Sequence, residues 1–189
     1  MLSFENDIQA ALKVLEAGGI ILYPTDTVWG IGADATNPAA VEKIYQLKQR
    51  PGQKAMIVLL ANEKDLLRHI AALDLQVFDY LQTTQKPTTV IYEGALGFAD
   101  NLTAPDGSIA IRICKEEFCR HLLQRFKKPL VSTSANISGE PTAKNFREIA
   151  QTIRQGVDYI VNYRQDDIRE YAPSAIVKWK NGAIEVIRS

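Results

Sequence analysis

Cysteine and histidine are scarce in this sequence, with only two of each among 189 residues. Cys114 and Cys119 show none of the spacing of a disulfide framework, which favours a reducing compartment. Together with His69 and His121 they are too few for a zinc cluster of the usual type. We therefore expect no metal site built from these side chains.

An excess of charge of one sign is also missing. Lys and Arg together number 22, Asp and Glu together number 22, and the formal net charge is zero. Attraction of the whole chain to nucleic acid or to an anionic membrane is excluded, because both depend on a surplus of positive charge. A local basic groove is still compatible with this balance.

Long hydrophobic runs are absent too. No apolar stretch approaches the roughly 18 residues that a membrane span needs. The first seven residues lack the basic start and the apolar run of a secretory signal. We expect a cytoplasmic protein that makes no contact with a membrane.

The abundant residues fit one globular α/β domain over residues 1–189, since 46% are hydrophobic and 23% are charged. Apolar residues at helical spacing alternate with short apolar runs that are typical of strands. The expected helices are Asp7–Ala17, one that starts at Asn37-Pro38 and ends before Pro51, Glu63–His69, Leu73–Leu81, Glu116–Phe126 and Asn145–Arg154. The expected strands are Ile20–Tyr23, Met56–Leu60, Thr88–Tyr92, Ser108–Ile113, Pro129–Val131 and Val157–Val161.

The clearest local pattern lies at the end of the chain. Two apolar segments, Ala175–Trp179 and Ala183–Ile187, flank Asn181-Gly182, a dipeptide that favours a type I′ turn. An antiparallel hairpin at this place makes the sheet mixed. We therefore predict an α/β fold with a twisted mixed sheet and flanking helices, and not a doubly wound parallel sheet.

A glycine-rich stretch, Gly30–Ala35, matches the pattern G-x-G-x-x-A of dinucleotide-binding folds. In those folds the glycines lead from a strand directly into a helix. Here the preceding strand ends at Tyr23 and the next helix begins only at Asn37-Pro38, so we interpret the stretch as a bend. We expect no nicotinamide cofactor, and the sequence has no G-x-x-x-x-G-K-[ST] loop.

Small hydroxyl and amide side chains gather at three points where predicted strands end or begin. These segments are Tyr23–Thr27, Ser132–Gly139 and Pro173-Ser174. Polar residues at strand ends line the ligand crevice of α/β sheets, and neutral donors suit a zwitterion or phosphate oxygens. The alternative is that these residues only form turns and caps.

Lys48, Arg50 and Lys54 crowd the end of the helix that Pro51 terminates. Such cations can complement the helix dipole, an effect worth about 0.3–1 kcal/mol, or they can share a bound anion. Arg112 stands alone on an apolar strand, and a buried guanidinium needs a partner. A carboxylate or phosphate ligand would supply that partner, and so would an Asp or Glu of the protein.

Five segments, taken in chain order, carry a resemblance to a known family: Y-P-T-D-T-V-W-G-I-G, L-K-Q-R-P, S-I-A-I-R, S-T-S-A-N-I-S-G and P-S-A-I-V. They resemble the YrdC-like family of threonylcarbamoyl-AMP synthases, from about Ile20 to Arg188. The resemblance implies a mixed sheet of the YrdC-like type with a large concave, locally basic cleft.

The resemblance also implies a reaction in which L-threonine, bicarbonate and ATP give threonylcarbamoyl-AMP and pyrophosphate, with Mg²⁺, for threonylcarbamoyladenosine in tRNA. It implies protein partners that transfer the threonylcarbamoyl group to tRNA. Lys48 and Arg50 would neutralise charge on the leaving pyrophosphate, and they form the catalytic set with Ser134 and Asn136. The implied threonine-binding residues are Thr27, Leu59, Arg112, Ser132 and Ser174. The implied ATP-binding residues are Arg50, Lys54, Ser108, Ser134, Thr142 and Arg188.

Two departures from the family pattern concern substrate and partner contacts. Leu59 stands where family members often carry a histidine, and Thr84–Thr89 replaces the signature W-P-G-P-L-T. Two other activities stay open for this sequence. One is a non-catalytic or regulatory protein of the same fold that binds tRNA or double-stranded RNA, and the other is carbamoyl transfer to a different acceptor.

Overall fold

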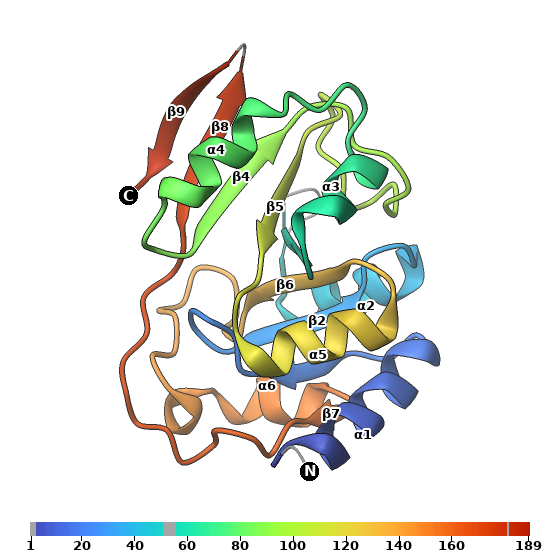
Figure 1. Cartoon of the computed structure of the whole chain (residues 1–189). Helices are drawn as coiled ribbons and strands as arrows, with labels where there is room; N and C mark the ends of the chain where they lie inside the picture. The colour runs from blue at the N-terminus through green and yellow to red at the C-terminus, as the bar shows by residue number, and fades with distance from the viewer. Residues whose placement is uncertain (1–2, 51–55, 181) are drawn as a thin grey trace.

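Short strands form one sheet in the computed structural model, which describes residues 3–50, 56–180 and 182–189. The strands are β1 (Ile21–Tyr23), β2 (Gly30–Asp34), β3 (Ile57–Leu60), β4 (Thr88–Tyr92), β5 (Ile109–Ile113), β6 (Leu130–Ser134), β7 (Tyr159–Ile160), β8 (Ala175–Lys180) and β9 (Ala183–Arg188). Their order across the sheet is β7-β1-β2-β6-β3-β5-β4-β8-β9 (Figure 1).

Parallel and antiparallel neighbours both occur in this sheet. The pairs β1·β7, β3·β5 and β4·β8 are parallel, and the other five pairs are antiparallel. The predicted mixed sheet is therefore confirmed. The predicted terminal strands pair antiparallel as β8 and β9. Of their turn, Asn181 lies outside the described residues, and Gly182 has a φ of +74°.

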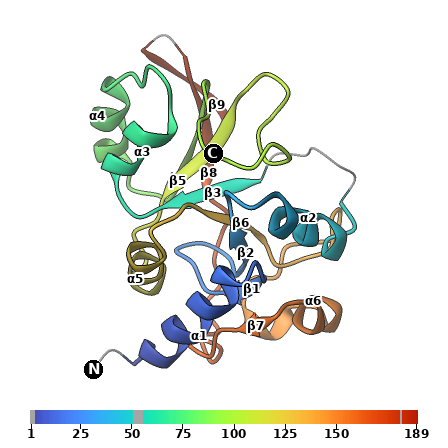
Figure 2. The ribbon, with the colours of Figure 1, turned by 90° about the vertical axis from the view of Figure 1, so that its right-hand side faces the viewer.

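Helices cover both faces of the sheet. They are α1 (Glu5–Glu16), α2 (Pro38–Leu47), α3 (Glu63–His69), α4 (Gln76–Thr83), α5 (Glu117–Phe126) and α6 (Gln151–Gly156), with a short 3-10 helix η1 (Phe146–Glu148). Figures 1 and 2 show α1 and α5 together on one face and α2 on the other. As predicted, Asn37 caps α2, because its side chain accepts from the N–H groups of Ala39 and Ala40. Within the described ranges, no helix has the length and apolar character to cross a membrane.

Side chains that alternate along the strands fill one core on each face. On β3, Val58 and Leu60 belong to a core that includes residues of α2 and α4, whereas Leu59 belongs to a second core with α1 and α5. Burying a side chain of this size contributes about 1.5–3 kcal/mol. Because both faces are covered, a polar side chain meets a ligand most readily at a strand end or in a loop.

The glycine-rich stretch is a buried strand, β2, and the predicted bend is wrong. It pairs with β1 on one side and with β6 on the other. A Cβ added to Gly32 would lie 2.7 Å from Cε1 of Tyr23, which real Cβ atoms essentially never do. The glycine is needed because the Tyr23 ring lies close to the backbone of β2, and this contact is invisible in the local sequence pattern.

The predicted helix Asn145–Arg154 is wrong as a single element, since the chain forms η1 and then α6. Between them Ile149 and Ala150 are extended, with ψ angles of 124° and 143°. The guanidinium of Arg154 donates to the carbonyl oxygens of Ile149 and Arg147 at 2.8 and 2.9 Å. These bonds satisfy backbone acceptors that the interrupted helix leaves without an intrahelical donor.

Replacing Gly32 with alanine should lower the free energy of unfolding by about 1–3 kcal/mol, because the new Cβ must displace the Tyr23 ring. Urea denaturation followed by circular dichroism measures the change. The control compares Tyr23→Leu with the double variant Tyr23→Leu/Gly32→Ala. Without the ring, the alanine should destabilise less, and equal effects in both backgrounds would contradict the contact.

Candidate active site

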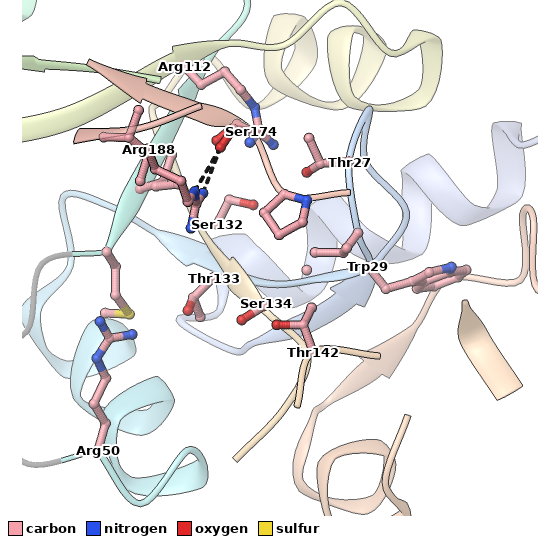
Figure 3. Close-up of a pocket in the computed structure, with 16 residues that line it drawn as sticks. Thr27, Trp29, Arg50, Arg112, Ser132, Thr133, Ser134, Thr142, Ser174 and Arg188 are labelled. Carbon is pink, nitrogen blue, oxygen red and sulfur yellow. Dashed lines mark hydrogen bonds between the residues drawn. The ribbon is translucent and has the colours of Figure 1, made fainter. Parts of the chain in front are cut away.

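A cavity of about 270 Å³ is lined by residues that are far apart in the sequence, from Thr27 to Arg188. Figure 3 shows their side chains converging from the loop before β2, the end of α2, β5, β6 and the two terminal strands. Eight residues predicted for the site lie in its wall: Thr27, Arg50, Arg112, Ser132, Ser134, Thr142, Ser174 and Arg188. The wall thus combines three guanidinium groups with neutral hydroxyls, and no carboxylate lines it within the described residues.

The loop after β1 fixes the hydroxyl of Thr27. Thr25 Oγ1 donates to the carbonyl oxygen of Val28 at 2.9 Å and accepts from the N–H of Thr27 at 3.0 Å. The two threonine hydroxyls lie 2.9 Å apart. Since the single proton of Thr25 Oγ1 is used on Val28, Thr27 must donate to Thr25. The hydroxyl of Thr27 therefore has only acceptor capacity left for a ligand.

Arg112 reaches the cavity from the end of β5, with 4% of its side chain exposed. Its Nη2 lies 3.1 Å from Oδ1 of Asp26. Of the two partners that the sequence allowed for this guanidinium, a ligand or an acid of the protein, the acid is therefore present. The pair is an ion contact without hydrogen-bond geometry, and Nε of Arg112 is buried with no hydrogen-bond partner. The guanidinium keeps donor capacity for a ligand although a carboxylate already balances its charge.

Strand β6 carries Ser132, Thr133 and Ser134 into the wall. The strand extends beyond the predicted Pro129–Val131 and is paired on both sides, with β2 and with β3. These hydroxyls therefore stand on a backbone that the ladder holds in place. A hydroxyl both donates and accepts at neutral pH, so the row can contact phosphate oxygens or ribose without titrating.

Lys48, the C-cap residue of α2, does not line this wall. It is 2% exposed, and its Nζ donates to the carbonyl oxygens of Ser134 and Asn136 at 2.5 and 2.6 Å. In this structure the side chain therefore links the end of α2 to the backbone that follows β6, and the implied contact with phosphate stays a prediction. Burial, reinforced by the charge of Arg50, lowers the pKa of Lys48 to about 8.

Arg50 lies in the wall just beyond α2, and Figure 3 shows it at the end of the cavity away from Arg112. Burial lowers the pKa of Arg50. An anionic ligand stabilises a partly desolvated guanidinium, so this position suits phosphate. Lys54 lies outside the described residues, in the segment that joins the wall residues Arg50 and Met56.

Arg188 lies in the wall directly after a β-bulge in β9. Ile176 of β8 pairs with Arg188, while the next residue of β8 pairs with Val186, so Ile187 is an extra residue in β9. Arg188 therefore stands opposite Ile176, which is itself a wall residue. The Nε and Nη2 of Arg188 donate to the carbonyl oxygen of Ser174 at 3.1 and 2.7 Å, the dashed lines of Figure 3.

The segment between β7 and β8 brings Ser174 to the cavity and runs along the left edge of Figure 1. Arg164, which has a φ of +67°, fastens this segment. Its Nη1 donates to the carbonyl oxygen of Thr25 at 3.1 Å and lies 3.6 Å from the carboxylate of Glu116. The loop that carries Thr27 is thereby tied to the segment that carries Ser174.

The sequence matches the family described as telomere recombination, which groups proteins named Sua5, YciO and YrdC, over residues 13–189. The chain belongs to this family. A curated relative from Photobacterium profundum, named threonylcarbamoyl-AMP synthase, is 35% identical over 159 residues, which are 82% of this chain and 86% of the relative. Another of the same name, from Idiomarina loihiensis, is 36% identical over 147 residues, or 76% and 79% of the two chains.

Solved structures of the Sua5/YciO/YrdC family share the fold. Sua5 of P. abyssi complexed with L-threonine matches with a TM-score of 0.86 at 21% identity, over 97% of this chain and 54% of that chain. YciO of E. coli matches with a TM-score of 0.81 at 22% identity, over 97% and 89% of the two chains. The predicted YrdC-like sheet with flanking helices is confirmed.

Two residues that the family resemblance placed at the site lie away from the wall. Leu59 is completely buried in the core of α1 and α5, and the wall residue on that face of β3 is Ile57, two positions earlier. Ser108 precedes β5, and at about 3.3 Å per residue it lies roughly 13 Å along the strand from Arg112. Its N–H donates to Oδ1 of Asp106. The implied ligand contacts of Leu59 and Ser108 therefore stay predictions.

Asn136 also lies outside the described wall. Its Nδ2 donates to the carbonyl oxygens of Ile137 and Glu140 at 2.9 and 2.8 Å, and its Oδ1 is buried with no hydrogen-bond partner. The side chain therefore shapes the loop after β6, and one carbonyl oxygen keeps its capacity to accept.

Sequence reasoning did not single out Trp29 or Thr133, which both lie in the wall. Trp29 is buried, and its ring centroid lies 4.8 Å from that of Phe146. Its place inside the segment that also holds Thr27 and Gly30 could have indicated it. Thr133 likewise lies inside the segment Ser132–Gly139, but alternation predicts that it faces away from its two serine neighbours.

Wild-type protein should gain stability relative to the Lys48→Met variant as the pH rises from about 8 to 10.5. Below this window the folded chain must keep a buried proton on Lys48, whereas above it the amine is neutral in both folded and unfolded chains. The unfolded state binds more protons within the window, so the difference should grow with pH, by at most about 3 kcal/mol.

Denaturation of both proteins at the two ends of this pH window measures the difference. Lys64→Met, on the exposed face of α3, is the matched control and should show no such trend. A pH-independent difference between wild type and Lys48→Met would contradict the lowered pKa.

Proposed function

We propose that this protein forms threonylcarbamoyl-AMP and pyrophosphate from L-threonine, bicarbonate and ATP, as a nucleotidyltransferase that supplies threonylcarbamoyladenosine to tRNA. The observation that carries the proposal is the convergence of Arg50, Arg112 and Arg188 with a row of hydroxyls around one cavity. The names of the curated relatives and the threonine complex of Sua5 support the same substrates.

The amino acid occupies the end of the cavity that holds Arg112, Thr27 and Ser174, which Figure 3 shows close together. Its carboxylate takes the donors of the Arg112 guanidinium. The Thr27 hydroxyl accepts from the ligand, and Ser132 completes this end. The nucleotide lies along Ser134 and Thr142, with its phosphates toward Arg50 and Arg188.

The chemistry needs no nucleophile from the protein. The amine of threonine attacks the carbon of bicarbonate, and water leaves to give a carbamate. A carbamate oxygen then attacks the α-phosphorus of ATP, the bond between the α-phosphorus and the bridging oxygen breaks, and pyrophosphate leaves. The guanidinium groups stabilise the charge that moves onto pyrophosphate, and the fixed hydroxyls position the reactants. The product then passes to protein partners that transfer its threonylcarbamoyl group to tRNA.

Mg²⁺ is the metal that this reaction class implies. Within the described residues, no group of three His, Cys, Asp or Glu side chains could hold a metal ion. Mg²⁺ commonly binds through substrate phosphates and water with few protein ligands, so this donor set fits an ion that arrives with ATP. The unpartnered Oδ1 of Asn136 is an oxygen of the type that Mg²⁺ prefers, and the ion would neutralise phosphate charge.

Incubation with ATP, bicarbonate, Mg²⁺ and L-threonine should release pyrophosphate, and omission of threonine should abolish the release. An enzyme-coupled pyrophosphate assay and mass spectrometry of the adenylate measure the two products. Threonine-independent release, or no release, would contradict the proposal. Release with carbamoyl phosphate in place of threonine would instead indicate carbamoyl transfer to another acceptor.

Two variants should affect opposite ends of the cavity and serve as controls for each other. Arg112→Lys should raise the KM for threonine at least about tenfold, since it loses the planar fork for a carboxylate, and should leave the KM for ATP near its wild-type value. Arg50→Ala should lower kcat/KM for ATP by about 100-fold or more, the effect of losing a charge-stabilising donor. Steady-state kinetics with each substrate varied in turn would expose any other pattern.

A further inference from the structure

We propose that Asp26 makes the Arg112 end of the cavity selective for a zwitterion over a simple carboxylate. The inference rests on the proposed function, because it assigns the amino acid to Arg112. It goes further in two ways. It gives a role to Asp26, which does not touch the ligand, and it states which net charge of the ligand Asp26 favours.

The first observation is the state of the Arg112–Asp26 pair. Arg112 is 4% exposed and Asp26 is 14% exposed, and Nη2 lies 3.1 Å from Oδ1. A buried guanidinium without a counter-charge is costly, so Asp26 neutralises it before any ligand binds. Because Nε of Arg112 and Oδ1 of Asp26 have no hydrogen-bond partner, the pair still has unused donor and acceptor capacity.

The second observation is the contrast with Arg188 in the same wall. The Arg188 guanidinium donates to the carbonyl oxygen of Ser174, which carries no formal charge. Arg188 therefore offers a full positive charge to a ligand, whereas Arg112 offers donors without net charge. Two guanidinium groups of the same wall therefore differ in their charge balance, and the one that Asp26 balances is Arg112.

A carboxylate that binds Arg112 brings a second negative charge next to Asp26, whose own charge already balances this guanidinium. Two like charges that are held close together with little water between them repel each other. A positive group on the same ligand offsets this repulsion, as the α-ammonium of an amino acid does. Thr27, whose hydroxyl can only accept, is a wall residue suited to that ammonium.

Asp26 acts from behind Arg112 and not from the wall. It lines a neighbouring cavity of about 280 Å³, and the next residue, Thr27, lines the main one. Glu63 lines the same neighbouring cavity and forms no ion pair with Arg112. Glu63→Gln therefore removes an equal charge from the same side of the molecule and is a matched control for Asp26→Asn.

The test compares the binding of L-threonine with that of 3-hydroxybutyrate, which keeps the carboxylate and hydroxyl and lacks the ammonium. Calorimetric titration of the wild type should give at least about tenfold tighter binding of threonine. Asp26→Asn should reduce this ratio at least about tenfold, and Glu63→Gln should leave it unchanged. Thermal denaturation checks that each variant is folded.

An unchanged ratio in folded Asp26→Asn, or an equal change in Glu63→Gln, would overturn the inference and leave the proposed function standing. A wild type that binds both ligands equally would also overturn it, and this comparison needs no variant. A wild type that binds no threonine at all, with or without ATP, would overturn the proposed function itself and the inference with it.

Discussion

The sheet is covered on both faces, and this constraint decides where the protein can hold a ligand. Alternate side chains of β3 enter two different cores, so neither face has room for a polar cluster in its middle. Hydroxyls and guanidinium groups gather near the ends of β5, β6 and β9, and on the segment that leads into β8. The cavity is therefore a product of the topology, which brings these ends to one place.

The charged groups around the cavity differ in how the fold balances them. Lys48 donates to two backbone carbonyl oxygens, Arg112 lies beside a carboxylate, and Arg188 donates to an uncharged carbonyl oxygen. A count of cations in the sequence treats these three side chains as equivalent. Their surroundings make one a structural link, one a neutral set of donors and one an open positive charge.

Much of the fold could be predicted from local sequence, because its determinants are local. Asn37 and Pro38 indicate the start of α2, and the Asn-Gly dipeptide between two apolar segments indicates the hairpin. Two of the three hydroxyl segments, Tyr23–Thr27 and Pro173-Ser174, lie where a strand ends or begins. The errors arise where a distant residue decides the outcome. Gly32 is a strand residue because of the Tyr23 ring, and no local pattern shows that contact.

The candidate site shows the same division between local and distant determinants. The family motifs, taken in chain order, predicted eight residues of the wall. Only the structure could show that Lys48 donates to backbone carbonyl oxygens and that Asp26 lies beside Arg112. A family position does not reveal which of two neighbours on the same strand face lines the cavity, and on β3 the one that does is Ile57, two residues before Leu59.

The bulge in β9 means that the position of the third guanidinium depends on the order of the last residues and less on the length of the strand. Ile187 occupies the additional place between Val186 and Arg188. A chain shortened by that one residue would form a regular ladder with arginine still opposite Ile176. Exchange of Ile187 and Arg188 would keep the composition and move the charge out of register. Variation in length at this end is therefore more compatible with the cavity than a rearrangement of the same residues.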